Sequence, residues 1–155
     1  MREIAILLHN IRSAHNVGSI FRTADAAGVS KIFLSGYTPL PVDRFGRLRK
    51  DIAKTALGAE TFIPWEYVKH IRNQISKLKN EGWCIVGIEQ DARAVDYRKF
   101  NPAAKTLFIL GNEVRGFSKS LRGACDVLVE IPMRGRKESL NVSVAAGIVL
   151  FGINR

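Results

Sequence analysis

The chain has 155 residues, of which 46% are hydrophobic and 25% are charged. This length favours a single domain over residues 1–155, and the balance of apolar and charged residues excludes a mainly disordered chain. Lysine and arginine number 24 against 14 aspartate and glutamate, so the net charge of +10 favours a polyanionic partner, with nucleic acid first. The chain has no apolar stretch of membrane-spanning length and no signal-peptide pattern, so we expect a cytoplasmic protein.

The first part of the chain alternates strands with helices. Apolar runs predict strands at residues 4–8 and 31–35. Between them, Asn16 is expected to cap a helix that ends at Gly28 and has an apolar face of Val17, Ile20, Phe21 and Ala24. Residues 36–51 resemble a basic loop and 61–64 a short strand. The next helix is expected to bury Val68, Ile71, Ile75 and Leu78.

The second part continues the alternation. Strands are predicted at 85–88, 106–110 and 127–131, with an irregular segment at 90–104 and helices beginning near Ser118 and Asn141. This order predicts an α/β fold, with a mostly parallel sheet and helices on both faces. Ligands of such sheets bind at the carboxyl ends of the strands. One rim should therefore carry the loops 9–16, 111–116 and 132–140.

Two cysteines, Cys84 and Cys125, lie in or beside apolar runs. Buried free thiols in a reducing compartment explain them best. A metal site would need a CxxC pair or a Cys/His cluster, and neither is present, so no metal is predicted.

The first of three informative segments surrounds Arg22. By helical geometry its side chain points away from the apolar face, so it is free to meet a group outside the core. The alternative is an ordinary exposed arginine, with Asn16 as a simple cap.

The second segment is the turn from Gly111 to Gly116. Its glycines have Walker A spacing, but Phe117 stands where a P-loop needs lysine, so a nucleoside triphosphate site is not expected. The turn could let a ligand approach the backbone closely, while Glu113 would repel a phosphate. The alternative is an ordinary strand-to-helix turn.

The third segment, residues 131–151, ends in a helix that is apolar on nearly every side. Such a helix must be covered all round, and a second subunit is a natural cover in a chain of this size. The alternative is a central helix of a monomer.

Together these segments resemble the motifs of one family, the TrmH (also called SpoU) branch of the SPOUT RNA methyltransferases. They stand in this chain as NVGSIFRTADAAGV, LFILGNEVRGFS and IPMRGRKESLNVSVAAGIVLF, in the family's order and spacing. The resemblance implies a C-terminal trefoil knot whose loops hold S-adenosylmethionine, and a homodimer with composite active sites. It also implies methylation of ribose 2′-oxygens in tRNA or rRNA.

The resemblance assigns roles to individual residues. Arg22 matches the arginine thought to activate the 2′-hydroxyl, and Asn16 matches the asparagine that supports it. Glu113 matches the motif-two glutamate, and Ser139 and Asn141 the polar pair of motif three. The cofactor's adenosine would be enclosed at Leu110, Gly111, Ile131, Met133 and Leu140. Because the pKa of arginine lies above ~12, stabilisation of the developing alkoxide competes with the general-base role for Arg22.

Two basic runs are expected to contact RNA phosphates: Arg44, Arg47, Arg49 and Lys50, and, beside motif three, Arg134, Arg136 and Lys137. Larger relatives carry additional domains or extensions. We therefore expect the catalytic domain itself to grip the RNA, with tRNA preferred over rRNA.

Two rival function classes are less well supported. A non-catalytic RNA-binding protein on the same fold would be favoured by loss of Arg22, Glu113 or Asn141, yet all three are present. A Rossmann-type oxidoreductase would need GxGxxG after the first strand, whereas residues 10–18 hold a single glycine.

Overall fold

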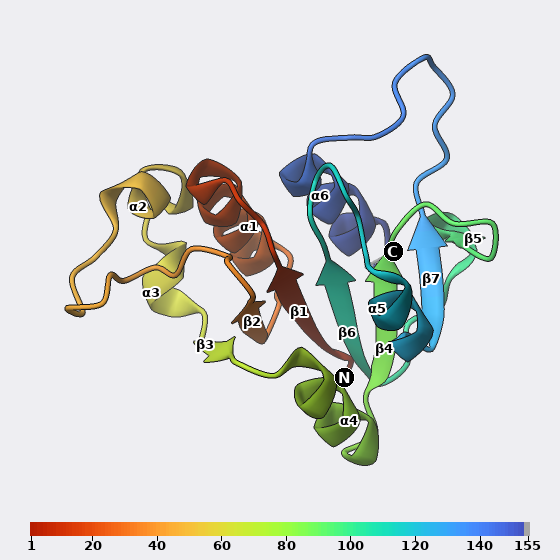
Figure 1. Ribbon diagram of the computed structural model, residues 1–155, viewed down its shortest axis with the longest axis horizontal. Helices are drawn as coiled ribbons and strands as arrows, with labels where there is room; N and C mark the ends of the chain where they lie inside the picture. Colours follow the sequence, from red (N-terminus) through yellow and green to blue (C-terminus); the bar gives the residue numbers. More distant parts are fainter. Residues whose placement is uncertain (154–155) are drawn as a thin grey trace.

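The structure is a computed structural model and describes residues 1–153. Within that range one sheet has seven strands in the order β3-β2-β1-β6-β4-β7-β5, and every neighbouring pair is parallel. The mostly parallel sheet is thereby confirmed (Figure 1). The strands are β1 (Glu3–His9), β2 (Lys31–Ser35), β3 (Trp65–Val68), β4 (Cys84–Ile88), β5 (Val95–Asp96), β6 (Lys105–Leu110) and β7 (Val127–Glu130).

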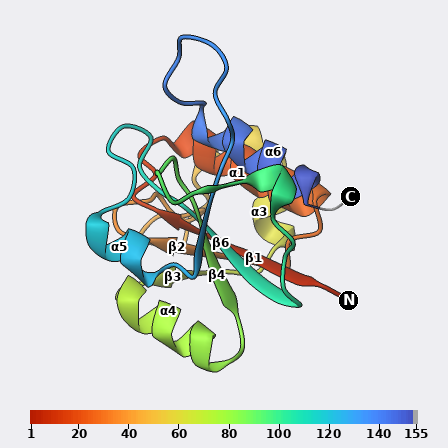
Figure 2. The ribbon, with the colours of Figure 1, turned by 90° about the vertical axis from the view of Figure 1, so that its right-hand side faces the viewer.

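Helices cover both faces of the sheet, as predicted. Figure 2 shows α1 and α6 on one face and α4 and α5 on the other, with α3 beside α1. The helices are α1 (Ala14–Ala26), α2 (Lys50–Ala56), α3 (Ala59–Phe62), α4 (Ile71–Asn80), α5 (Lys119–Ala124) and α6 (Val142–Gly152), and a 3-10 turn, η1, spans Tyr97–Lys99. The trefoil knot implied by the resemblance stays a prediction.

The central strands are apolar on both sides because both faces are covered. In β1, Ile4, Ile6 and Leu8 enter the core cluster under α1 and α6, while Ala5 and Leu7 enter the cluster under α4 and α5. This alternation follows from the two-residue period of a strand. The loops at the carboxyl ends of these strands are therefore anchored to a sheet that is packed on both faces.

The predicted start of the first helix is wrong. Ser13, rather than Asn16, is the N-cap of α1, and its hydroxyl accepts a hydrogen bond from the backbone N–H of Asn16 at 3.1 Å. The Asn16 side chain is thereby left for another contact. The end at Gly28, with φ of +78°, is confirmed, and so is the buried apolar face.

The segment between residues 49 and 71 departs most from the prediction. Helix α2 begins inside the expected loop, residues 61–62 belong to α3 instead of a strand, and Val68 pairs with Ser35 in the sheet instead of lying on α4. Leu57 and Gly58, with φ of 52° and 93°, divide this segment into two short helices. Elements of four to seven residues are too short to show a clear helical period.

Cys84 and Cys125 are free thiols, as predicted, but they are only partly buried. Burial raises the pKa of the Cys125 thiol to about 11. No helix among the described residues is both long and apolar enough to cross a membrane.

Candidate functional site

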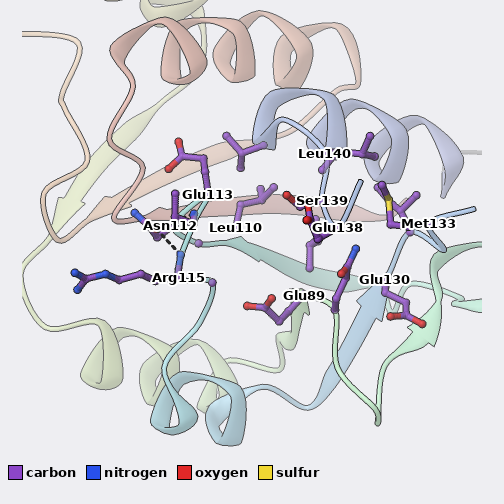
Figure 3. A pocket seen from close by; sticks show the side chains of 18 residues that line it. Glu89, Leu110, Asn112, Glu113, Arg115, Glu130, Met133, Glu138, Ser139 and Leu140 are labelled. Carbon is purple, nitrogen blue, oxygen red and sulfur yellow. Dashed lines mark hydrogen bonds between the residues drawn. The ribbon is translucent and has the colours of Figure 1, made fainter. Parts of the chain in front are cut away.

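A cavity of about 340 Å³ opens at the carboxyl edge of the sheet, where β4, β6 and β7 end beside the start of α6 (Figure 3). All the residues expected to enclose a cofactor line it: Leu110, Gly111, Ile131, Met133 and Leu140. Glu113 and Ser139 line it as well. The fold thus brings motif two and motif three to one concave site.

Sequence reasoning missed the wall contributed by β4 and α6. Ile88 is the last residue of β4, Glu89 and Gln90 follow it, and Val142 and Ala145 come from the first turns of α6. The rule that places ligands at carboxyl ends of strands applies equally to β4 and could have found the first three.

The Phe117 ring packs against the start of the motif-two turn. A Cβ on Gly111 would lie 2.5 Å from the Phe117 ring, and one on Gly87 would lie 2.7 Å from it. Gly111 is therefore required by the packing of Phe117, which is 5% exposed. The carboxylate of Glu89 accepts the backbone N–H of Phe117 at 2.6 Å and thereby fixes the end of the turn.

The side chain of Asn112 stabilises the same turn by hydrogen bonds. Its Oδ1 accepts the backbone N–H groups of Val114 and Arg115 at 2.9 and 2.8 Å, and its Nδ2 donates to the hydroxyl of Tyr37 at 2.7 Å. It also donates to the carbonyl of Asn10 at 3.3 Å. The cavity wall is thus tied to the loops that follow β1 and β2.

The cavity is acidic in a chain that is strongly basic. A single cation, Arg115, lines it. The lining also includes four carboxylates, those of Glu89, Glu113, Glu130 and Glu138. Figure 3 shows the Arg115 side chain extending away from the other labelled groups. One oxygen of Glu113, Oε1, is buried without a hydrogen-bond partner. Such a lining favours a cation and disfavours a phosphate.

Motif one and motif three meet at the N-terminal ends of two helices. The Asn141 side chain donates to Oδ1 of Asn16 at 3.2 Å, and its own oxygen caps α6 by accepting the N–H of Ser143 at 2.8 Å. Both asparagines therefore lie together at the N-terminal end of α6, where Asn141 follows Ser139 and Leu140 in the sequence.

Arg22 lies elsewhere. It is exposed on α1 and lines a separate hollow between α1 and α2, together with His15, Lys54 and Phe151. No carboxylate contributes to the lining of that hollow. Gly18 lets α2 approach α1, because a Cβ there would lie 2.4 Å from the carbonyl oxygen of Ile52. Arg22 therefore does not line the cavity of the same chain.

Most of the basic residues expected to contact RNA lie on two loops, and Lys50 is the first residue of α2. Arg134, Arg136 and Lys137 are exposed on the loop before α6, which projects beyond the sheet (Figure 1). In the other loop the ion pairs Arg47–Asp43 and Arg49–Asp51 take up part of the positive charge. Residues 1–153 contain no group of His, Cys, Asp and Glu side chains suited to a metal ion.

Comparison with known proteins agrees with this architecture. The model of the SpoU rRNA methylase family matches residues 3–151. A putative TrmH family tRNA/rRNA methyltransferase of Staphylococcus saprophyticus is 35% identical over 150 residues, which are 97% of this chain and 57% of the relative. The chain thus spans less than two thirds of the length of that relative.

Solved structures give the same result. The AdoMet-bound rRNA methyltransferase of Sinorhizobium meliloti superposes with a TM-score of 0.86 at 30% identity, over 98% of this chain and 56% of that one. The TrmH/SpoU tRNA modifying enzyme of A. aeolicus gives 0.85 at 27% identity, over 99% and 74%. The family match over nearly the whole chain, together with the shared fold, places this protein in the SpoU (TrmH) methylase family.

Proposed function

We propose that the protein transfers a methyl group from S-adenosylmethionine to a ribose 2′-oxygen of RNA, with tRNA as the preferred substrate. The observation that carries this proposal is the convergence of motif two and motif three on one acidic cavity. The family membership and the basic surface elsewhere support it.

The cavity residues fit the cofactor. Its volume lies in the range of small-molecule sites. Ile88, Leu110, Ile131 and Val142 offer an apolar slot for adenine, while the surrounding carboxylates suit the positive sulfonium and the amino group of its methionine part. S-adenosylmethionine would supply a methyl group on a positively charged sulfur, ready for attack by an oxygen.

The protein's own contribution is alignment and charge stabilisation. In the transfer an O–C bond forms as the C–S bond breaks, with its electron pair going to sulfur, and the hydroxyl proton leaves to water or a nearby base. Arg22 would stabilise the alkoxide that develops on the ribose, because its high pKa makes it a poor proton acceptor. The Asn16–Asn141 contact would align the neighbouring loops with the reacting groups.

Arg22 can serve this role only if a second subunit brings it to the cavity, so we propose a homodimer with composite sites. Helix α6 supports the proposal: its buried side packs inside the subunit, whereas Val144 and Phe151 are 49% and 53% exposed. Together with Ile148 they form an apolar stripe at helical spacing.

Calorimetry and product mapping test the function. The protein should bind S-adenosylmethionine and convert unmodified tRNA to a product whose 2′-O-methyl nucleotide is located by mass spectrometry. RNA binding without cofactor binding would instead favour a non-catalytic RNA-binding protein.

Two measurements test the composite site. Light scattering should give about twice 17.2 kDa for the wild type, and Val144→Glu should give monomers while Phe62→Glu, an exposed control on α3, should not. Mixed dimers of Arg22→Ala with the cavity variant Gly111→Val should recover up to about a quarter of the wild-type rate, because half the dimers then hold one intact site. A monomeric wild type, or mixed dimers without activity, would refute the composite site.

A further inference from the structure

An ordered loop tip at residues 42–48 projects beside α2, at the end of the molecule far from β5 and β7 (Figure 1). Val42 and Leu48 pair as an antiparallel bridge that closes it. The tip contributes little to the core, since Phe45 and Leu48 are 66% and 60% exposed. Phe45 and Leu48 therefore form a small exposed apolar patch on an ordered loop.

Asp43 orders the tip. Its Oδ1 accepts the backbone N–H groups of Phe45 and Arg47 at 2.8 and 3.0 Å, and its Oδ2 accepts Nε of Arg47 at 2.8 Å. Gly46, with φ of 79°, supplies the left-handed residue of the turn and donates its N–H to the carbonyl of Asp43. These hydrogen bonds order the backbone that carries Phe45 without the help of a partner.

Two guanidinium groups lie against the Phe45 ring. The Cζ atoms of Arg44 and Arg47 are 4.8 and 5.0 Å from its centroid. The exposure of Phe45 shows that most of the residue nevertheless stays open. The tip therefore presents an exposed aromatic ring with two cations against it, and Arg49 and Lys50 follow the tip in the sequence.

We propose that this tip is a nucleobase-stacking site, in which Phe45, flanked by Arg44 and Arg47, stacks on an unpaired base of the RNA. The proposal rests on the proposed function and adds the kind of contact and the class of substrate. Aromatic rings and guanidinium planes stack on any base, while the arginine charges attract the backbone. An apolar protein surface would leave these cations without partners.

The proposal has a consequence for the substrate. Bases inside a duplex are already stacked and unavailable, so the tip selects RNA with a single-stranded loop or bulge. It also separates two contributions to RNA affinity: phosphate contacts, which depend on salt, and stacking, which hardly does.

The experiment compares Phe45→Ala with Phe62→Ala, a phenylalanine of similar exposure, 71%, that lies outside the tip. Affinity for a tRNA-sized stem-loop should fall roughly 5- to 100-fold in Phe45→Ala, the range expected for loss of one base–aromatic stack, and should hold in the control. The salt dependence of binding and the affinity for S-adenosylmethionine should stay as in the wild type. Phe45→Trp should bind normally, and RNA should quench the additional indole fluorescence.

Equal affinities of Phe45→Ala and Phe62→Ala would overturn the stacking site while leaving the proposed function intact. So would an equal loss for a blunt duplex without unpaired bases, or an indole signal of the Phe45→Trp variant that saturating RNA leaves unchanged. A wild type that binds no RNA at all would instead refute the proposed function.

Discussion

Two hollows of this small protein differ in charge. The cavity at the ends of β4, β6 and β7 has four carboxylates in its lining, whereas the hollow between α1 and α2 contains Arg22, Lys54 and His15 and no carboxylate. Each is matched to one reactant of the proposed transfer, a small cation or a polyanion. Under the proposed function, a second subunit is required to bring the two environments together.

The largest expected effect comes from removing Arg22, the cation of the basic hollow that we propose to act on the ribose oxygen. Arg22→Ala should lower the single-turnover rate by ~10²-fold or more, the size typical of losing a positioned electrostatic contact. Cofactor affinity and Tm should hardly change, because the side chain is exposed. Arg22→Lys should also be poor, since it keeps the charge but loses the planar fork. If saturating RNA restores the Arg22→Ala rate, the residue positions substrate only.

A smaller effect is expected from a substitution at Gly111, in the motif-two turn that lines the acidic cavity. Gly111→Ala places a Cβ against the Phe117 ring and should displace the motif-two turn. We expect about 1–3 kcal/mol of destabilisation and a cofactor affinity about tenfold lower. Gly123→Ala, where an added Cβ meets nothing within 4 Å, is the matched control. Calorimetry and thermal unfolding compare the two, and identical behaviour would show that the turn adapts freely.

Removing charge from the cavity tests the electrostatic contrast directly. Glu130→Gln combined with Glu138→Gln should weaken S-adenosylmethionine binding by about 2- to 5-fold, as expected for solvent-accessible charges. Binding of the product, whose thioether sulfur carries no charge, should change less. Glu81→Gln, an exposed carboxylate outside the cavity lining, controls for net charge. Equal losses for cofactor and product would mean that shape, and not charge, governs this cavity.

The smallest expected effect is on the pH dependence of stability and comes from His9, the last residue of β1. His9 donates to or accepts from Ser35 Oγ at 2.8 Å, and burial lowers its pKa below the ordinary 6.5. The unfolded chain takes up this proton more readily, so stability is full above pH 6.5 and falls as the pH drops through the lowered pKa. Protonation of His9 at low pH should lower Tm by less than about 3 °C. The His9→Gln variant should lack this contribution to the pH dependence. A matched His70→Gln variant, exposed before α4, should keep the full pH dependence.

Residues close together in sequence predicted much of the site. The apolar runs of β1, β2, β4 and β6 determined the sheet, because each must be buried on both faces. The carboxyl-edge rule then placed motif two and motif three at one rim, and the same rule extends to Glu89, which was not predicted. The Asn16–Asn141 contact joins residues far apart in sequence, and nothing in either motif alone could have shown it.

The sequence by itself determined the strand and helix alternation, the basic character and the three motifs, since these depend on local periodicity and composition. The tertiary structure decided the division of charge. The four carboxylates of the cavity come from the ends of different strands and a loop, so their shared location depends on strand order. It also decided that Phe117 fills the space beside Gly111, and that Arg22 faces a different hollow. Packing between distant segments fixes such contacts, and no single segment encodes them.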